Sequence, residues 1–196
     1  MRILALLVLY PLAAAPALAA TWQPVERIVA YPVTGATGLA LYRSIGERGP
    51  EIGGRRVIAH TRFDLLWTRR YRPQADGSCV LAVAVPHLTV TTTLPKAPGG
   101  LAPAVAASWR RFIDGIAAHE RFHAREIVAM VERIAAFSDG LSAPADPGCA
   151  RVRAKLQAYL AKSIAAHEKA SRDFDAAEWG EDGAMRKLAL SLINGP

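Results

Sequence analysis

The residues best suited to chemistry lie within Ala117–Ala124, which contains the motif His-Glu-Arg-Phe-His. On a helix, residues four apart lie on the same face, about one turn apart. His119 and His123 can therefore direct two imidazole nitrogens at one metal ion, most simply a tetrahedral Zn²⁺. Glu120 would lie beside that metal, where a carboxylate can take a proton from a metal-activated water. We predict a zinc site with Glu120 as its general base.

The sequence around the motif favours a metal site over a solvated helix with two surface histidines. The chain has only 5 histidines, and two of them have this spacing. Apolar residues recur every three or four positions around the motif, which predicts an amphipathic helix with the histidines near its apolar face. These residues are Phe112, Ile116, Phe122, Ile127, Met130 and Ile134. The solvated helix stays the alternative, because so short a motif also occurs by chance.

The first residues have the pattern of a secretory signal peptide. A positively charged start, Met1-Arg2, precedes an apolar run from Ile3 to Leu18, and Ala17-Leu18-Ala19 supplies the small residues of a cleavage site. We predict a signal peptide over residues 1–20 and a periplasmic or secreted mature chain, with an uncleaved anchor as the alternative. No later stretch is long and apolar enough to span a bilayer, so no stable membrane span is expected after signal removal.

The chain has two cysteines, Cys79 and Cys149, and both lie in the part predicted to be exported. In an oxidising compartment such a pair most simply forms a disulfide. The alternative is that one of them is a nucleophile or a metal ligand. Neither has the spacing of a metal-binding cysteine pair, which disfavours that alternative.

The chain carries a formal net charge of +7. Its basic residues are scattered among Glu and Asp, and they form no stripe interleaved with aromatic residues. We therefore expect a solvated cationic surface and no nucleic-acid partner.

The elements that must position the motif divide the chain into two parts. Composition changes near residues 94–100, a segment that contains Pro and Gly, from Thr- and Val-rich to Ala-, Arg- and Glu-rich. We predict a single α+β domain over residues 21–196. Its β-rich part, 21–100, forms a small antiparallel or mixed sheet with one short helix, and its helical part, 101–196, carries the motif on a long helix.

Hydrophobic periodicity and turn residues give the expected elements. Strands are predicted at 22–33, 56–71 and 78–93, the last two joined at Asp76-Gly77, with a helix capped by Thr37 at 38–45 and a loop at 46–54. Further helices are predicted at 102–137, 149–174 and 184–193. The strand-region histidines, His60 and His87, are expected to be structural.

The order of these features resembles a bacterial family of predicted secreted zinc-dependent proteases, also described as a domain of unknown function. The resemblance covers about residues 22–184 and rests on the HERFH motif together with Gly49-Pro50, Trp67, Cys79, Thr93-Leu94-Pro95, Trp109, Cys149 and Asp173-Phe174-Asp175. It implies a zincin-like α+β fold, protease activity and a periplasmic or secreted setting.

The chain departs from this family where the third metal ligand is expected. The family usually reads Tyr-Asp-x-x-Thr-x-His-Gly there, whereas residues 174–180 read FDAAEWG, without the histidine and about two residues shorter. A catalytic zinc normally keeps three protein ligands plus water. We take Glu178 as the expected third ligand, with Asp182, Asp175 and His167 as alternatives. Asp175 can instead orient a ligand from behind, and a solvated acidic turn is the alternative to any ligand role.

These observations predict an exported zinc metallopeptidase that hydrolyses peptide bonds of peptides or proteins in the cell envelope. His119, His123 and Glu178 would hold the Zn²⁺, and Glu120 would act as general base toward the metal-activated water. The alternative is a non-catalytic or weakly metal-binding envelope protein that retains the protease fold. The missing histidine favours that alternative, whereas the presence of Glu120 disfavours it, because a structural helix has no need of that carboxylate.

Overall fold

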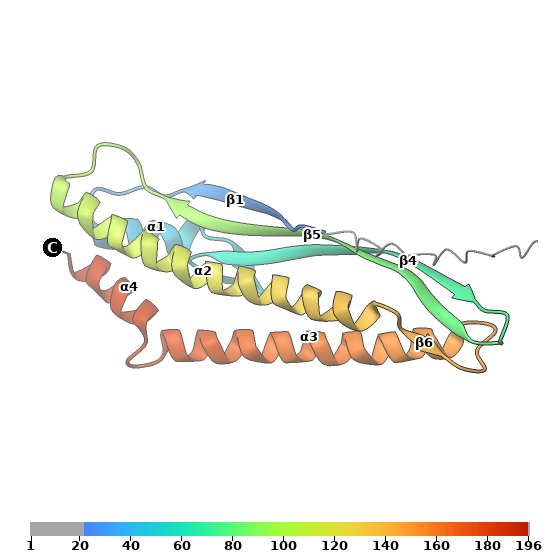
Figure 1. Cartoon of the computed structure of the whole chain (residues 1–196). Coiled ribbons are helices and arrows are strands. Elements are labelled where there is room, and N and C mark those ends of the chain that lie inside the picture. Colours follow the sequence, from blue (N-terminus) through green and yellow to red (C-terminus); the bar gives the residue numbers. More distant parts are fainter. Residues whose placement is uncertain (1–21, 196) are drawn as a thin grey trace, which may run out of the picture.

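The computed structural model describes residues 22–195, so the predicted signal peptide lies outside the described residues. A long twisted sheet from the first part of the chain lies along the long helices of the second part (Figure 1). The predicted α+β class, with a sheet-containing first part and a helical second part, is therefore confirmed. Within residues 22–195, no helix combines the length and the apolar character needed to cross a membrane.

Strand β5, Cys79–Lys96, forms the centre of the main sheet. Strand β4, His60–Pro73, pairs with it antiparallel, as the predicted hairpin requires. Strand β1, Val25–Pro32, pairs parallel with the second half of β5 on its other side. The short strand β6, Ser142–Ala143, pairs with the first two residues of β5. The sheet is mixed, and β4 forms one of its edges.

The segment predicted as a loop, residues 46–54, is more ordered than expected. Helix α1, Gly38–Arg48, begins at the predicted cap, Thr37, but continues past Gly46. A small hairpin follows, in which strand β2, Glu51–Ile52, pairs with strand β3, Arg55–Arg56. Its turn residues, Gly53 and Gly54, both have positive φ, which glycine adopts without a side-chain clash. Two-residue strands are too short to give a periodic sequence pattern, so the prediction missed them.

Three helices make up the second part: α2 (Pro103–Ser138), α3 (Ala150–Trp179) and α4 (Ala184–Asn194). Helices α2 and α3 lie side by side and run in opposite directions, with α4 near the start of α2 (Figure 1). Helix α3 continues five residues beyond its predicted end. The run from Asp175 to Trp179 contains two alanines and neither Gly nor Pro, so nothing in it stops the helix before Gly180. Asp175 and Glu178 therefore lie on the last turns of α3, whereas Asp182 lies in the exposed turn that follows.

The buried side chains of α2 connect two parts of the core. Near its start, Phe112 and Ile116 pack with buried residues of α1 and α4. Further along, Ile127, Met130, Val131 and Ile134 pack with Leu88 and Val90 of β5. The His-Glu-Arg-Phe-His motif lies between these two clusters, so its side chains are held by packed helix on both sides.

The predicted disulfide between Cys79 and Cys149 is present and joins the start of β5 to the residue preceding α3. Both cysteines are buried, and they pack with Leu81, Ala143, Val152 and Leu156. The bond therefore anchors the end of α3 that is remote from the motif to the sheet.

Candidate metal centre

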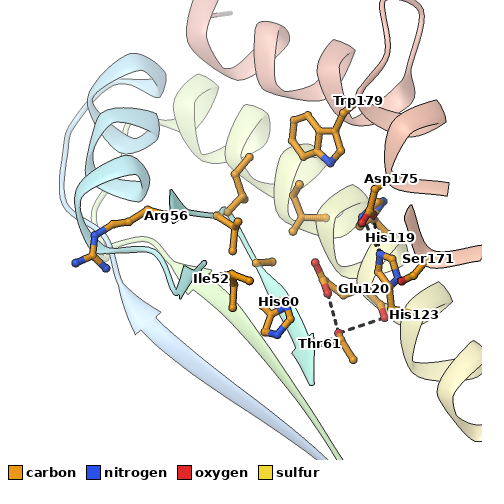
Figure 2. A pocket seen from close by; sticks show the side chains of 14 residues that line it. Ile52, Arg56, His60, Thr61, His119, Glu120, His123, Ser171, Asp175 and Trp179 are labelled. Carbon is orange, nitrogen blue, oxygen red and sulfur yellow. Dashed lines mark hydrogen bonds and ion pairs between the residues drawn. The ribbon is translucent and has the colours of Figure 1, made fainter. Parts of the chain in front are cut away.

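His119 and His123 lie on the same face of α2, one turn apart, as their spacing predicts (Figure 2). Their Nε2 atoms are 3.2 Å apart. The side chains expose only 6% and 12% of their surface, so both imidazoles are largely withdrawn from solvent. Two buried imidazoles that present the same ring nitrogen to one point are what a shared metal ion requires.

A third donor comes from α3. The carboxylate oxygen Oδ1 of Asp175 lies 3.1 Å from Nε2 of His119 and 2.9 Å from Nε2 of His123. Among residues 22–195, these three side chains form the group of His, Cys, Asp and Glu residues whose ligand atoms gather closely enough to hold a metal ion. Two imidazoles and one carboxylate are a common ligand set for catalytic zinc.

The spacing of the three ligand atoms fits a tetrahedral zinc ion. Ligand bonds of 2.0–2.1 Å place neighbouring ligand atoms about 3.3–3.4 Å apart at the corners of a tetrahedron. The three observed separations, from 2.9 to 3.2 Å, fall only a few tenths of an ångström below this value. The separations of the three ligand atoms therefore fit a bound zinc ion.

His123 is also held through its other ring nitrogen. Its Nδ1 lies 2.8 Å from the hydroxyl of Ser171 on α3. If Nε2 binds a metal, Nδ1 must carry the ring proton, and it can then donate that proton to the Ser171 hydroxyl. Such a contact fixes the tautomer and the ring orientation of a metal-binding histidine. Sequence reasoning did not identify Ser171 as part of the site.

The Nδ1 atom of His119 is buried and has no hydrogen-bond partner within the described chain. Oε2 of Glu178 lies 3.9 Å from it, too far for a hydrogen bond but within reach after a small side-chain rotation. Glu178, the expected third ligand, thus faces the ring nitrogen of His119 that points away from the shared centre. This position suits a carboxylate that orients a metal-binding histidine.

Helix α3 presents its site residues as one stripe. Ser171, Asp175 and Glu178 are four and three residues apart, which places all three on the face toward α2. Phe174 lies on the same face and stacks on the rings of His119 and Phe122, with centroid distances of 4.9 and 3.7 Å. This spacing was readable in the sequence, but only with the helix extended to Trp179.

The charges of the cluster support one another. Burial raises the pKa of the Asp175 carboxyl, but hydrogen bonds from His119 and His123, and their charges, hold it well below its usual range. Burial lowers the pKa of His123, but the hydrogen bond to Asp175 and the charges of Asp175 and Glu120 raise it above its usual value. Asp175 is therefore ionised, which is the form that binds a metal ion.

Glu120 is buried, 5% exposed, and is held by a residue of the sheet. The Thr61 hydroxyl on β4 donates a hydrogen bond of 2.7 Å to Oε2 of Glu120. The Thr61 oxygen also lies 3.0 Å from the hydroxyl oxygen of Thr92 on β5. Because the single Thr61 proton points to Glu120, Thr92 must donate to Thr61. The carboxylate predicted as a general base is thus fixed by a pair of hydroxyls that the sequence did not reveal.

These residues line one cavity of about 550 Å³, which we call the site cavity. His119, Glu120, His123 and Asp175 form its polar wall, and β4 and the β2–β3 hairpin face them across the opening (Figure 2). His60, which was expected to be structural, lines the cavity on the β4 side. Burial is the main cause that lowers the pKa of His60, and the charge of Glu120 opposes this shift.

Two of the alternative ligands lie away from the cluster. Asp182 is fully exposed and lies 3.8 Å from Lys187. His167 lies one helical turn before Ser171 and packs edge-on against Phe63, with centroids 6.1 Å apart. The remaining strand histidine, His87, is exposed and contacts the Thr68 hydroxyl at 2.8 Å. None of these three residues contributes an atom to the cluster of His119, His123 and Asp175.

Comparison with known protein families gives a match over most of the chain. The family described as "Bacterial protein of unknown function (DUF922)" matches residues 28–181, which include the motif, both cysteines and the last turns of α3. Neither the curated proteins nor the solved structures contain a match.

Proposed function

We infer that this chain, which belongs to the bacterial DUF922 family of unknown function, is an exported zinc-dependent metallopeptidase with a zincin-like fold. The observation that carries this proposal is the convergence of three ligand atoms, Nε2 of His119, Nε2 of His123 and Oδ1 of Asp175, at separations of 2.9 to 3.2 Å. The second helix of a zincin-like site would then be α3, since it supplies the third ligand.

Asp175 is the better third ligand in this proposal, and Glu178 takes a supporting role. Asp175 directs an oxygen at the same point as both Nε2 atoms. Glu178 faces the Nδ1 atom of His119. Among the described residues, this nitrogen has no hydrogen-bond partner. When Nε2 binds a metal, Nδ1 of His119 carries a proton that the Glu178 carboxylate can accept. Asp175 stands where the family pattern also has Asp, and in this proposal it takes the ligand role that the missing histidine was expected to fill.

A bound zinc ion would supply a Lewis acid that polarises the substrate carbonyl and makes a coordinated water more acidic. Glu120, which lines the same cavity as the three ligands, would accept the proton of the attacking water and pass it to the amine nitrogen as the carbon–nitrogen bond breaks. The Thr61 hydroxyl donates to one carboxylate oxygen, and this hydrogen bond opposes rotation of the Glu120 side chain away from the cavity. The net reaction adds one water across the peptide bond and leaves a carboxylate and an amine.

In this proposal the protein acts in the cell envelope or in the surrounding medium. The Cys79–Cys149 bond fits an oxidising compartment outside the cytoplasm. Peptides or proteins of that compartment are then the substrates to test first.

The proposal is tested by elemental analysis of the purified mature protein. We expect one zinc per chain in the wild type and in Glu120→Gln, and none in His119→Ala. Peptide hydrolysis by the wild type should be lost in both variants, in Glu120→Gln without loss of metal. A wild type that holds no zinc, even after incubation with the ion, would contradict the proposal and favour the non-catalytic envelope protein. Full activity of Glu120→Gln would exclude Glu120 as the base.

A further inference from the structure

A second cavity adjoins the site cavity. It has a volume of about 630 Å³ and extends along β4 and α3 toward Phe63 and His167; we call it the side cavity. The two cavities share six lining residues, three from the hairpin and β4 and three from α2 and α3. These are Ile52, His60, Thr61, His123, Ser171 and Asp175.

The shared residues show where the cavities meet. They come from both walls, so the two spaces join across the gap between the sheet and the helices, at the proposed metal ligands His123 and Asp175. The cleft therefore continues on both sides of the cluster. An enzyme that removes terminal residues needs one side closed by a group that binds the chain end. On the site-cavity side, Arg56 donates to the Gly49 carbonyl at 2.6 Å and faces Glu51 at 3.7 Å, so its guanidinium already has partners. The arginines of the side cavity can bind an acidic side chain or a terminal carboxylate, and a comparison of blocked with unblocked peptides distinguishes the two.

The site cavity offers an apolar surface. Beside the cluster it is lined by Val57, Ile58, Ala59, Ile116 and Trp179. Ile52 and Trp179, at its margins, expose 43% and 37% of their surface. Large apolar side chains exposed at the margin of a cavity favour an apolar ligand group, since binding removes both surfaces from water.

The side cavity has a different character. Apart from the residues that it shares with the site cavity, its lining includes two arginines, Arg62 and Arg172, and one acidic residue, Glu168. Arg172 lies 3.7 Å from Glu168 in an exposed pair, and Arg62 lies 3.1 Å from Asp64, also exposed. Exposed pairs of this kind are weak, so the guanidinium groups can exchange partners. This end of the cleft therefore favours an acidic group over a basic one.

We propose that the cleft binds an extended internal segment of a polypeptide, with an apolar side chain in the site cavity and an acidic side chain in the side cavity. This inference rests on the proposed function, because it places the bond to be cleaved at the cluster between the two cavities. It makes the protein an endopeptidase that selects substrates by the residues on either side of that bond.

The test measures binding by Glu120→Gln, with and without added zinc, so that it does not depend on turnover. The probes are fluorescently labelled peptides of about ten residues that contain one Leu and one Glu, in either order. They are prepared with both ends blocked and with both ends free. A matched set contains Lys in place of Glu. Blocked and unblocked Leu/Glu peptides should bind about equally, and the Lys peptides about fivefold more weakly, as expected for partly exposed charges. Arg172→Glu should reverse the preference between Glu and Lys peptides. Ile52→Ala should weaken binding of both sets.

Two exposed residues on the outward face of β4 supply matched controls. Leu66→Ala is paired with Ile52→Ala, and Arg70→Glu with Arg172→Glu; neither control should change binding. Three results would overturn the inference. They are binding only of peptides with a free chain end, an unchanged preference between Glu and Lys peptides in Arg172→Glu, and no peptide binding at all. Blocked peptides that bind with the expected preferences but are not cleaved by the wild type would support the binding mode and refute the proposed peptidase activity.

Discussion

The hydroxyl of Thr61 donates a hydrogen bond of 2.7 Å to the buried carboxylate of Glu120, and this contact joins the sheet to the motif helix. The two residues are 59 positions apart in the sequence. The Thr92 hydroxyl, 3.0 Å away on the neighbouring strand, orients Thr61 in turn. The proposed general base is thus positioned by β4 and β5 as well as by α2.

Replacing Thr61 with Val removes the hydroxyl at nearly constant volume and leaves the Glu120 carboxylate without this donor. Leaving a buried polar group unpaired costs about 1–3 kcal/mol, so the free energy of unfolding should fall by that amount in urea denaturation. Turnover should fall while zinc content stays unchanged, because Thr61 is not a ligand. Thr61→Ser keeps the donor and should restore most of the turnover. Thr68→Val, on the exposed face of the same strand, is the control, and an equal effect of both Val variants would contradict the assignment.

The ligand set can be separated by three single substitutions on α3. Asp175→Ala should abolish stoichiometric zinc binding, because it removes a ligand. Glu178→Ala should weaken zinc affinity only about 10- to 100-fold, as loss of a group that orients a ligand does. Asp173→Ala, an exposed residue paired with Lys169 at 2.6 Å, should change neither. Zinc affinity is measured by competition with a chelating dye. Loss of zinc in Glu178→Ala but not in Asp175→Ala would restore Glu178 as the ligand.

Much of the fold was predictable because its sequence patterns are local. The motif helix, the β4–β5 hairpin with its Asp76-Gly77 turn and the Thr37 cap were all read from residues close together in the chain, and all are present. The disulfide was predicted because the chain has only two cysteines and was expected to be exported. Each of these features needs only local periodicity, one turn or one pair of residues.

The site was only partly predictable, because its remaining residues come from distant elements. Thr61 and Ser171 are ordinary residues in the sequence, and their roles arise only when β4 and α3 pack against α2. Asp175 was recognised as an acidic candidate, but with the helix ended at Phe174 its register relative to His123 was undefined. Extension of α3 to Trp179 sets that register and brings Asp175 to the histidines.

Reduction of the Cys79–Cys149 bond should lower stability markedly. The bond joins residues 70 positions apart, and closing a loop of that length is worth about 4 kcal/mol in the chain-entropy model. For a chain of this size that corresponds to a fall of roughly 10 °C in Tm, measured by thermal unfolding with and without reductant. The variant with both cysteines replaced by Ser should already melt at the lower temperature and should not respond to reductant. An unchanged wild-type melt after complete reduction would show that the bond contributes little.

Two glycines of α1 give opposite expectations for the same substitution. A Cβ on Gly38 would collide with the backbone carbonyl of Leu192 in α4, whereas a Cβ on Gly46 would meet nothing within 4 Å. Gly38→Ala should therefore lower the free energy of unfolding by about 1–3 kcal/mol, because α4 must move away from α1. Gly46→Ala should raise it by up to about 1 kcal/mol through helix propensity. Urea denaturation of the two variants measures both effects, and a Gly38→Ala protein as stable as Gly46→Ala would show that α4 is not packed closely against α1.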